Sequence, residues 1–532
     1  MKSIVIKEGL VVDGTGGQRF KGDVAIEDGI ITEVGKLPSN KASAIIDARN
    51  QVIAPGFIDM HCHADFSLPI LPTADSLVHQ GITTAVIGQC GLSPAPLLER
   101  HREEIIAALS NFFEGLKTGM PWEEWSSFGE YLNLLDRMGI SINIAPLVGQ
   151  GTIRENIMGF AAGRANPNQI EQMRSEIIKA IDEGSIGLST GLIYPPGSYT
   201  STDELIELTH VVGKHNSFYF SHIRGEAETL LDAVAEAIQI GKETGAPVQI
   251  SHFKAAGREN WDKSAEALKM IDQAIAKGID ISTDMYPYTA GSTGLATILP
   301  EWAQEGGKKA TLKRLNDPSM RAKMKHDMET SGFAKSMEWD TVLINGSPRQ
   351  PKYQGHFVLE LANESGQTPH EWIFNALFET ELQMVMAVFG MSEDNRRLEM
   401  KHPAMTFCTD GMGLTEKGPL AKSLPHPRNY GAFTRILGRY VREEGVLTLE
   451  EAIHKMTGLA AKRLGLADRG FIRPGLAADL VVFDPATVKD KSTYKKPHQY
   501  PEGISHVLVN GRLVVEDGVH THARPGRILK RN

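Results

Sequence analysis

The middle of the chain alternates short apolar runs with longer amphipathic stretches. The longer stretches predict helices, most clearly over residues 227–244 and 261–277, and Ser201 with Glu204 predicts a capping box at the start of another. Eight apolar runs have the length of buried strands: 57–60, 83–88, 141–147, 186–189, 217–221, 248–251, 279–283 and 405–408. Strands that alternate with helices are typical of an α/β fold with parallel strands, and eight such units match a (β/α)8, TIM-like barrel.

Both ends of the chain have a different pattern, in which short strands are separated by turn signals such as Asp13-Gly14. The strand pattern of the first 55 residues returns at residues 480–483 and 507–515. There Asn510-Gly511 is a strong hairpin signal. We therefore predict one small β-sandwich domain assembled from residues 1–55 and 467–532, and a barrel domain over residues 56–466.

The connection after the seventh predicted strand is long. Within it, residues 301–355 are rich in charged residues and in methionine. We interpret this segment as an insertion after strand seven and as a candidate lid subdomain.

Composition narrows the function classes. Of the 532 residues 41% are hydrophobic, which is enough for a large core, and the formal net charge is −9 with the basic residues scattered. A nucleic-acid-binding protein is expected to have a basic patch, and none is visible in the sequence. The three cysteines have no regular spacing, which indicates a reducing cytoplasm, and no apolar run approaches the roughly 20 residues of a membrane span. We expect a cytoplasmic protein that binds neither nucleic acid nor membrane, and the oligomeric state stays open.

Residues of the types that commonly bind metal ions (His, Cys and Asp) follow five of the eight predicted strands. The carboxyl ends of barrel strands meet at one face, where active sites are built. After the first strand, His61 and His63 are two positions apart, so both side chains of an extended segment point the same way and can share one ion. Two unrelated histidines are the alternative interpretation of this spacing.

The other four strands are followed by a cysteine, two histidines and an aspartate. A lone cysteine is usually a small buried apolar residue, but at a strand end Cys90 is also a plausible thiolate ligand. His222 and His252 each follow a serine and precede a basic residue by two positions, and this matched placement favours metal ligation. Asp410, in an Asp-Gly pair that is otherwise typical of a turn, is the candidate ligand and proton carrier.

These motifs, in this order, resemble the amidohydrolase superfamily and, within it, the D-aminoacylase (N-acyl-D-amino-acid deacylase) family. The resemblance covers nearly the whole chain, beginning at residues 9–16. Many members of the superfamily bridge two metals through a carboxylated lysine at the end of strand four, whereas residues 187–194 contain no lysine. The D-aminoacylase family uses a cysteine after strand two instead, which matches Cys90.

The resemblance implies a zinc-dependent hydrolase of C–N (amide) bonds that converts small N-acyl-D-amino acids to a carboxylate and a free D-amino acid. One zinc ion would be tightly bound and a second site, weaker or partly occupied, would lie beside it. The ligands would be Cys90, His222 and His252 for the first ion, and His61, His63 and Asp410 for the second. Water activated by the metal would attack the amide, with Asp410 as general base and then general acid.

The resemblance also implies how the substrate is held. Tyr194 would hydrogen-bond the acyl carbonyl, and the α-carboxylate would be gripped by Lys254, Tyr286, Ser292 and Arg428. A structural ion pair is the alternative role of Arg428. The segment between Asp410 and Arg428 is longer than in the best-known members of the family, so the side-chain preference cannot be carried over.

Two other functions compete with this interpretation. A cyclic-amide hydrolase of the dihydropyrimidinase or dihydroorotase type predicts the bridging lysine that this sequence lacks. A non-catalytic scaffold of the same fold predicts broken ligand positions, and all six are present. The preference for D substrates comes from the resemblance alone.

Overall fold

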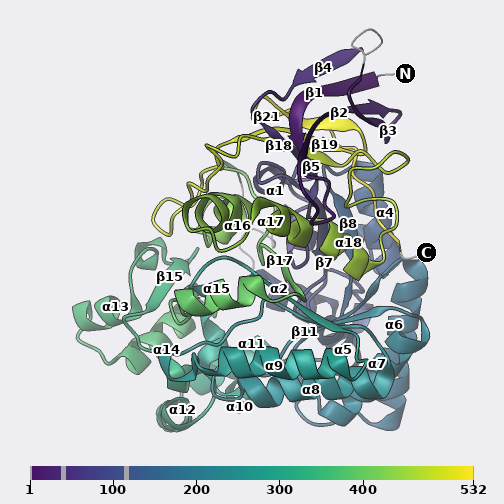
Figure 1. The fold of residues 1–532 in the computed structure, drawn as a ribbon. Helices are drawn as coiled ribbons and strands as arrows, with labels where there is room; N and C mark the ends of the chain where they lie inside the picture. Colours follow the sequence, from purple (N-terminus) through teal and green to yellow (C-terminus); the bar gives the residue numbers. More distant parts are fainter. Residues whose placement is uncertain (1–2, 38–42, 113–118, 419, 531–532) are drawn as a thin grey trace.

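The computed structural model describes residues 3–37, 43–112, 119–418 and 420–530 (Figure 1). The extreme ends of the predicted terminal domain and its residues 38–42 lie outside the described residues. The centre of the molecule contains parallel strands: β6 (Phe57–Asp59), β7 (Ile82–Ile87), β8 (Asn143–Pro146), β9 (Val148–Gly149), β10 (Gly187–Gly191), β11 (Phe218–His222), β12 (Val248–Ile250), β13 (Ile281–Met285) and β17 (Met405–Phe407). Each of the eight strands predicted in this region is confirmed to within two residues.

These strands pair in two parallel sheets, in the orders β6-β7-β8 and β9-β10-β11-β12-β13-β17. The sheets also meet at both edges. The amide of Met60 donates to the carbonyl of Phe407 over 3.2 Å, and the amide of Ile186 donates to the carbonyl of Pro146 over 2.7 Å. All strands of this region therefore run in one direction, and their carboxyl ends lie on the same side.

Helices pack around the parallel strands. The two predicted with most clarity are α8 (Leu230–Thr244) and α9 (Lys263–Ala276). The others near these strands are α1 (Asp75–Val78), α2 (Arg102–Phe112), α4 (Phe128–Met138), α5 (Gln150–Met158), α6 (Pro167–Glu183), α7 (Thr202–Lys214), α15 (Glu393–Lys401), α16 (Arg428–Arg435), the π-helix η9 (Ile436–Glu443), α17 (Leu449–Met456) and α18 (Gly458–Leu464). Among the described helices, none has the combination of length and apolarity that crossing a bilayer requires.

The predicted capping box of α7 is only half formed. The Ser201 hydroxyl accepts a hydrogen bond from the Glu204 amide over 3.4 Å, as predicted. The Glu204 carboxylate, however, forms an ion pair with the fully buried Arg154. Leaving the buried Arg154 guanidinium unpaired would cost more free energy than losing the second hydrogen bond of the capping box. The Glu204 carboxylate therefore pairs with Arg154 and does not bond to the Ser201 amide.

Strands from both ends of the chain form one nine-stranded sheet, where the purple and yellow ribbons lie together in Figure 1. Its order is β21-β20-β19-β18-β5-β1-β2-β3, with β4 paired to β1. The hairpin predicted at Asn510-Gly511 joins β19 to β20, and both residues have the positive φ angles, 47° and 73°, that a two-residue turn needs. The bounds are β1 (Ser3–Val11), β2 (Phe20–Glu27), β3 (Ile30–Gly35), β4 (Ala44–Asp47), β5 (Val52–Pro55), β18 (Leu480–Phe483), β19 (Ile504–Val509), β20 (Arg512–Glu516) and β21 (Val519–His520).

The long connection after β13 folds around a small sheet of its own. Strand β16 (Val385–Val388) pairs antiparallel with both β14 (Gly291–Gly294) and β15 (Val342–Gly346). A separate hydrophobic cluster that reaches from Leu295 to Met386 holds this segment together. Its helices are α10 (Glu301–Gln304), α11 (Gly307–Leu315), α12 (Pro318–Thr330), α13 (Val358–Glu364) and α14 (Pro369–Glu379).

One buried carboxylate connects the nine-stranded sheet to the parallel strands. Asp479, next to β18, forms an ion pair with Arg469 and accepts a hydrogen bond from the Asn510 amide over 2.6 Å. The same carboxylate accepts a hydrogen bond from the side-chain Nδ2 of Asn143, on β8, over 3.0 Å. Asp479 and Arg469 are 4% and 2% exposed, so neither charge has water as a substitute partner.

Substituting Asp479→Asn should therefore lower the free energy of unfolding by about 3–5 kcal/mol, because it removes the buried partner of the Arg469 charge and leaves only an exposed one. The matched control is Asp468→Asn, which removes the exposed partner of the same guanidinium and should cost less than about 1 kcal/mol. Chemical denaturation of both variants measures the difference. An equal decrease in the free energy of unfolding for both variants would show that the buried ion pair contributes no more stability than the exposed one.

Candidate metal centre

The predicted ligands all lie at the carboxyl ends of parallel strands. His222 is the last residue of β11, and the others follow β6, β7, β12 and β17 within a few residues. Three of them, Cys90, His252 and Asp410, have positive φ angles of 56°, 35° and 47°. Left-handed backbone is uncommon for residues with a Cβ and clusters at functional sites. Here it turns the chain sharply where each of these strands ends.

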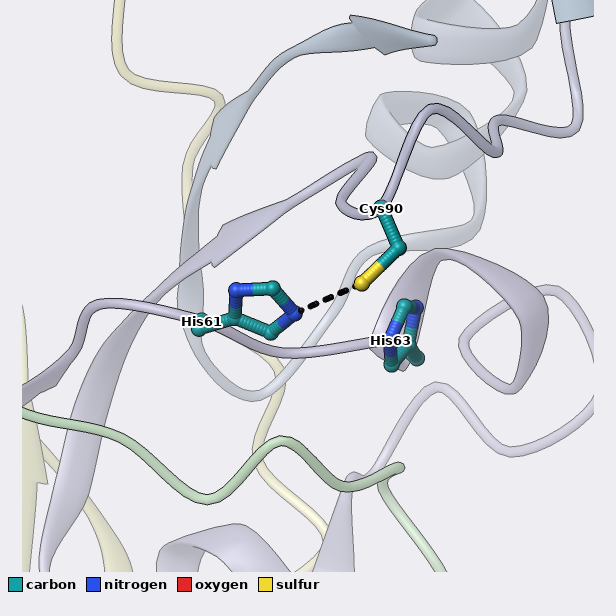
Figure 2. Close-up of side chains that lie close together, drawn as sticks. All are labelled: His61, His63 and Cys90. Atoms are coloured by element: carbon teal, nitrogen blue, oxygen red, sulfur yellow. Dashed lines mark hydrogen bonds between the residues drawn. The ribbon is translucent and has the colours of Figure 1, made fainter. Parts of the chain in front are cut away.

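The Cys90 sulfur lies among three imidazole rings. It is 3.3 Å from Nε2 of His61, 3.6 Å from Nδ1 of His222 and 3.5 Å from Nε2 of His252. Figure 2 shows the sulfur pointing at the His61 ring, with His63 beside it. Two sets of three ligand atoms lie within 4.8 Å of one another, and both include Cys90: one adds His61 and His63, the other His222 and His252.

The donor set fits a thiophilic divalent cation such as zinc, for which sulfur and imidazole nitrogen are the usual ligands. Burial lowers the pKa of His61 well below its usual range and the pKa of His222 to about 3, so both rings are neutral and can donate a lone pair. Burial raises the pKa of the Cys90 thiol well above its usual value. A bound cation would favour the thiolate, because metal binding releases the ligand's proton.

Asp410 and Arg428 form a buried ion pair beside these rings. One oxygen of Asp410 is 3.6 Å from Nε2 of His61 and 3.4 Å from Nε2 of His63, and the other is 2.7 Å from Nη1 of Arg428. Burial by itself would raise the pKa of Asp410, but Arg428 and the nearby imidazoles outweigh it and hold the pKa well below its usual range. The Arg428 guanidinium also lies over the Tyr286 ring, 4.6 Å from its centre.

A cavity of about 400 Å³ opens onto this cluster. All predicted site residues line it except His61, which is fully buried. The Tyr194 hydroxyl is 3.0 Å from the Thr293 hydroxyl, and burial raises the pKa of Tyr194 well above its usual value, so the phenol stays protonated. The structure therefore brings together side chains that were predicted at the carboxyl ends of seven different strands or in the loops after them.

The prediction missed Glu226, a buried carboxylate behind two of the rings. Its Oε1 atom is 3.1 Å from Nδ1 of His252, 3.6 Å from Nε2 of His222 and 2.5 Å from Nζ of Lys254. Burial would raise the pKa of Glu226, but Lys254 and the two histidines lower it strongly. The only sequence signal is a carboxylate four residues after His222, and no helix or strand spacing indicates that the loop folds back.

Comparison with known proteins gives the family of the chain. The model of the Amidohydrolase family matches residues 44–327 and 412–515. An N-acyl-D-aspartate deacylase of Alcaligenes xylosoxydans xylosoxydans is 35% identical over 99% of this chain and 94% of its own. A crystal structure of D-aminoacylase is 34% identical, covers 99% of both chains and has a TM-score of 0.84. An N-acyl-D-glutamate deacylase from Bordetella bronchiseptica, solved with zinc and a phosphonate inhibitor, is 32% identical, covers 100% of both chains and also has a TM-score of 0.84.

The chain belongs to the amidohydrolase family and, within it, to the D-aminoacylase group of hydrolases that act on amide bonds. Its mixed α/β fold is the fold of that group.

Metal-free protein should lose stability as the pH falls. The folded chain holds the pKa of His222 at about 3, whereas the same side chain in an unfolded chain titrates near 6.5. The unfolded state therefore takes up a proton first, so this contribution to stability is complete above about pH 6.5 and declines towards about pH 3. Thermal midpoints of chelator-treated protein between about pH 7.5 and about pH 4.5 measure the decline.

In that series, His222→Gln should give a shallower dependence on pH than the unsubstituted chain. His210→Gln is the matched control, because His210 is exposed on α7, and it should keep the original slope. Three equal slopes would contradict the assignment of the decline to His222.

Proposed function

We propose that this protein hydrolyses N-acyl-D-amino acids to a carboxylate and a free D-amino acid, with zinc as its cofactor. The observation that carries the proposal is the central place of the Cys90 sulfur, within 3.6 Å of nitrogens from three histidines. A cysteine in this position distinguishes the site from the lysine-bridged centres of other amidohydrolases. Strand β10 (Gly187–Gly191), where such a lysine would stand, contains none.

The tightly bound zinc ion would be held by Cys90, His222 and His252, and a second site would be formed by His61, His63 and Asp410. The distances among these side chains and their burial support the assignment. When bound, zinc supplies a Lewis acid for the amide carbonyl and makes water acidic enough to act as a nucleophile near neutral pH. Glu226 would orient His222 and His252 through the ring nitrogens that face away from Cys90.

Asp410 would move the proton. Because Arg428 keeps its carboxylate ionised, Asp410 can accept a proton from the attacking water. The same carboxyl group then donates the proton to the departing nitrogen, since an amine anion is too poor a leaving group. Its oxygen lies 3.4 Å from His63, at the floor of the cavity where the amide would be placed.

Four side chains would grip the α-carboxylate, and Tyr194 would donate a hydrogen bond to the acyl oxygen. Arg428 can meet a carboxylate with two parallel N–H groups, Lys254 adds a point charge, and the hydroxyls of Tyr286 and Ser292 can donate. All four line the same cavity as Asp410. The protonated Tyr194 phenol can stabilise the negative charge that develops on the acyl oxygen.

We further propose that the parallel strands form one closed (β/α)8 barrel, since hydrogen bonds connect β17 to β6 as well as β8 and β9 to β10. The shared nine-stranded sheet supports a domain made from residues 1–55 and 467–532, beside a barrel domain of residues 56–466. Residues 301–355 belong to an inserted unit whose hydrophobic cluster extends to Leu295 and Met386. A cytoplasmic location stays a prediction.

Zinc-loaded protein should hydrolyse N-acetyl-D-amino acids and leave the matching L compounds intact. Asp410→Asn should lower kcat by about 10²–10⁴-fold, because the amide cannot carry the proton. Asp182→Asn, at the exposed end of α6, is the matched control and should keep full activity. A panel of D and L pairs, followed by release of free amino acid, measures both effects. Absence of turnover for every pair, in protein shown to contain zinc, would remove this function.

Cys90→Ala should weaken zinc binding by at least about 100-fold, because outer-shell substitutions already cost about 10–100-fold. Cys408→Ala is the matched control: Cys408 is equally buried but stands outside both ligand sets. Competition with a zinc chelator measures the affinity. Unchanged affinity in the Cys90 variant would show that the sulfur is not a ligand.

A further inference from the structure

The relatives differ in the amino-acid side chain that their names specify, since one is named for D-aspartate and another for D-glutamate. Both of these substrates carry a second carboxylate. Whether this protein accepts a second carboxylate therefore depends on the charges that line its own cavity.

Apart from the metal centre, the cavity has mainly apolar walls. They come from the loop after β7, from the loops after β10, β12 and β17, and from the segment between β13 and β17. The larger apolar side chains include Leu92, Ile193, Trp261, Phe389, Met412 and Leu414, and uncharged polar side chains such as Asn345 and Gln383 also line the cavity.

Among the described residues, three cationic side chains line the cavity: Lys254, Arg258 and Arg428. The Arg428 guanidinium is 2.7 Å from the Asp410 carboxylate, and the Lys254 ammonium is 2.5 Å from the Glu226 carboxylate. Arg258 is exposed at the mouth, with its guanidinium 5.7 Å from the centre of the Trp261 ring. Each buried cation is therefore already matched by a buried carboxylate before the substrate's α-carboxylate arrives.

Four carboxylates line the same cavity, so acidic groups outnumber the cations. Glu226 and Asp410 are buried, and Glu259 lies at the mouth beside Arg258, with Glu338 the fourth. His426 adds no positive charge, because burial, reinforced by Arg428, lowers the pKa of its ring well below the usual range. A second substrate carboxylate would thus enter a cavity without an uncommitted buried cation to receive it.

We propose that the side-chain pocket of this protein takes neutral, preferably apolar, D-amino-acid side chains and rejects a second carboxylate. The proposal rests on the N-acyl-D-amino-acid hydrolase function and names its substrate class. Apolar walls favour an apolar side chain through burial, while an unpaired carboxylate loses its hydration without compensation. Glu226 is central to the discrimination, because its negative charge beside Lys254 leaves that lysine little excess positive charge once the α-carboxylate is bound, and it opposes a second anion nearby.

The sharpest test compares N-acetyl-D-glutamine with N-acetyl-D-glutamate on the zinc-loaded protein. The two substrates have nearly the same shape and differ in side-chain charge. We expect kcat/KM for the glutamine substrate to exceed that for the glutamate substrate by on the order of 100-fold. N-acetyl-D-methionine, which adds apolarity at similar length, should be better again by about tenfold.

The outcomes separate the two proposals. Equal or faster turnover of the glutamate substrate would overturn the side-chain proposal and leave the deacylase function in place. Failure of all three substrates, together with their L forms, would overturn the function and the side-chain proposal with it.

Glu226→Gln tests the cause, because it leaves the Lys254 charge unmatched while keeping the shape of the side chain. Within this variant the glutamate-to-glutamine ratio of kcat/KM should rise by at least about tenfold, even if both values fall. Glu259→Gln is the matched control at the mouth, where water and salt screen the charge, and should change the ratio by less than about threefold. An unchanged ratio in Glu226→Gln would overturn the role given to Glu226.

Discussion

The rest of the site depends on one buried sulfur surrounded by imidazole nitrogens. Cys90 and its three histidine neighbours come from strand ends that are far apart in the sequence, and burial leaves the thiol protonated and the rings of His61 and His222 neutral. These buried ligand atoms carry lone pairs that face one point, and a bound cation would stabilise this arrangement. The parallel strands supply the geometry for this, since only strand ends that lie on one side can bring residues 61, 90, 222, 252 and 410 together.

Two buried ion pairs lie beside the candidate ligand atoms, and their charged groups contact the imidazole rings differently. Asp410–Arg428 lies next to His61 and His63, while Glu226–Lys254 lies behind His222 and His252. In the first pair the cation keeps a carboxylate ionised that faces the cavity. In the second pair both charged groups contact the His252 ring, and the Glu226 carboxylate also lies 3.6 Å from Nε2 of His222. The two carboxylates therefore stand on different sides of the candidate ligands, and one of them faces the cavity beside Arg428.

Most of the strand order could be predicted from the sequence, because buried parallel strands appear as apolar runs between amphipathic helices. The clustering of the candidate ligands could be predicted because these residues follow those runs directly. Glu226 could not, because its position depends on a loop that folds back without regular spacing. The β14-β16-β15 sheet was also missed, since it pairs segments near residues 291, 342 and 385 that are separated by helices. Glu204 was assigned to a helix cap, because its partner Arg154 is distant in sequence and only the folded chain brings it close.

The segment between β13 and β17 has its own hydrophobic cluster, and partly buried residues packed against it, including Phe333, Met337 and Val388, also line the cavity. A substitution at these positions disturbs the packing of that segment, whereas the metal ligands rest on the larger core of the parallel strands. A substitution in this segment can thus reshape one wall of the cavity while the candidate ligands keep their support. In this architecture one wall of the cavity and the candidate metal ligands are packed on separate cores, so substitutions can alter the first without disturbing the second.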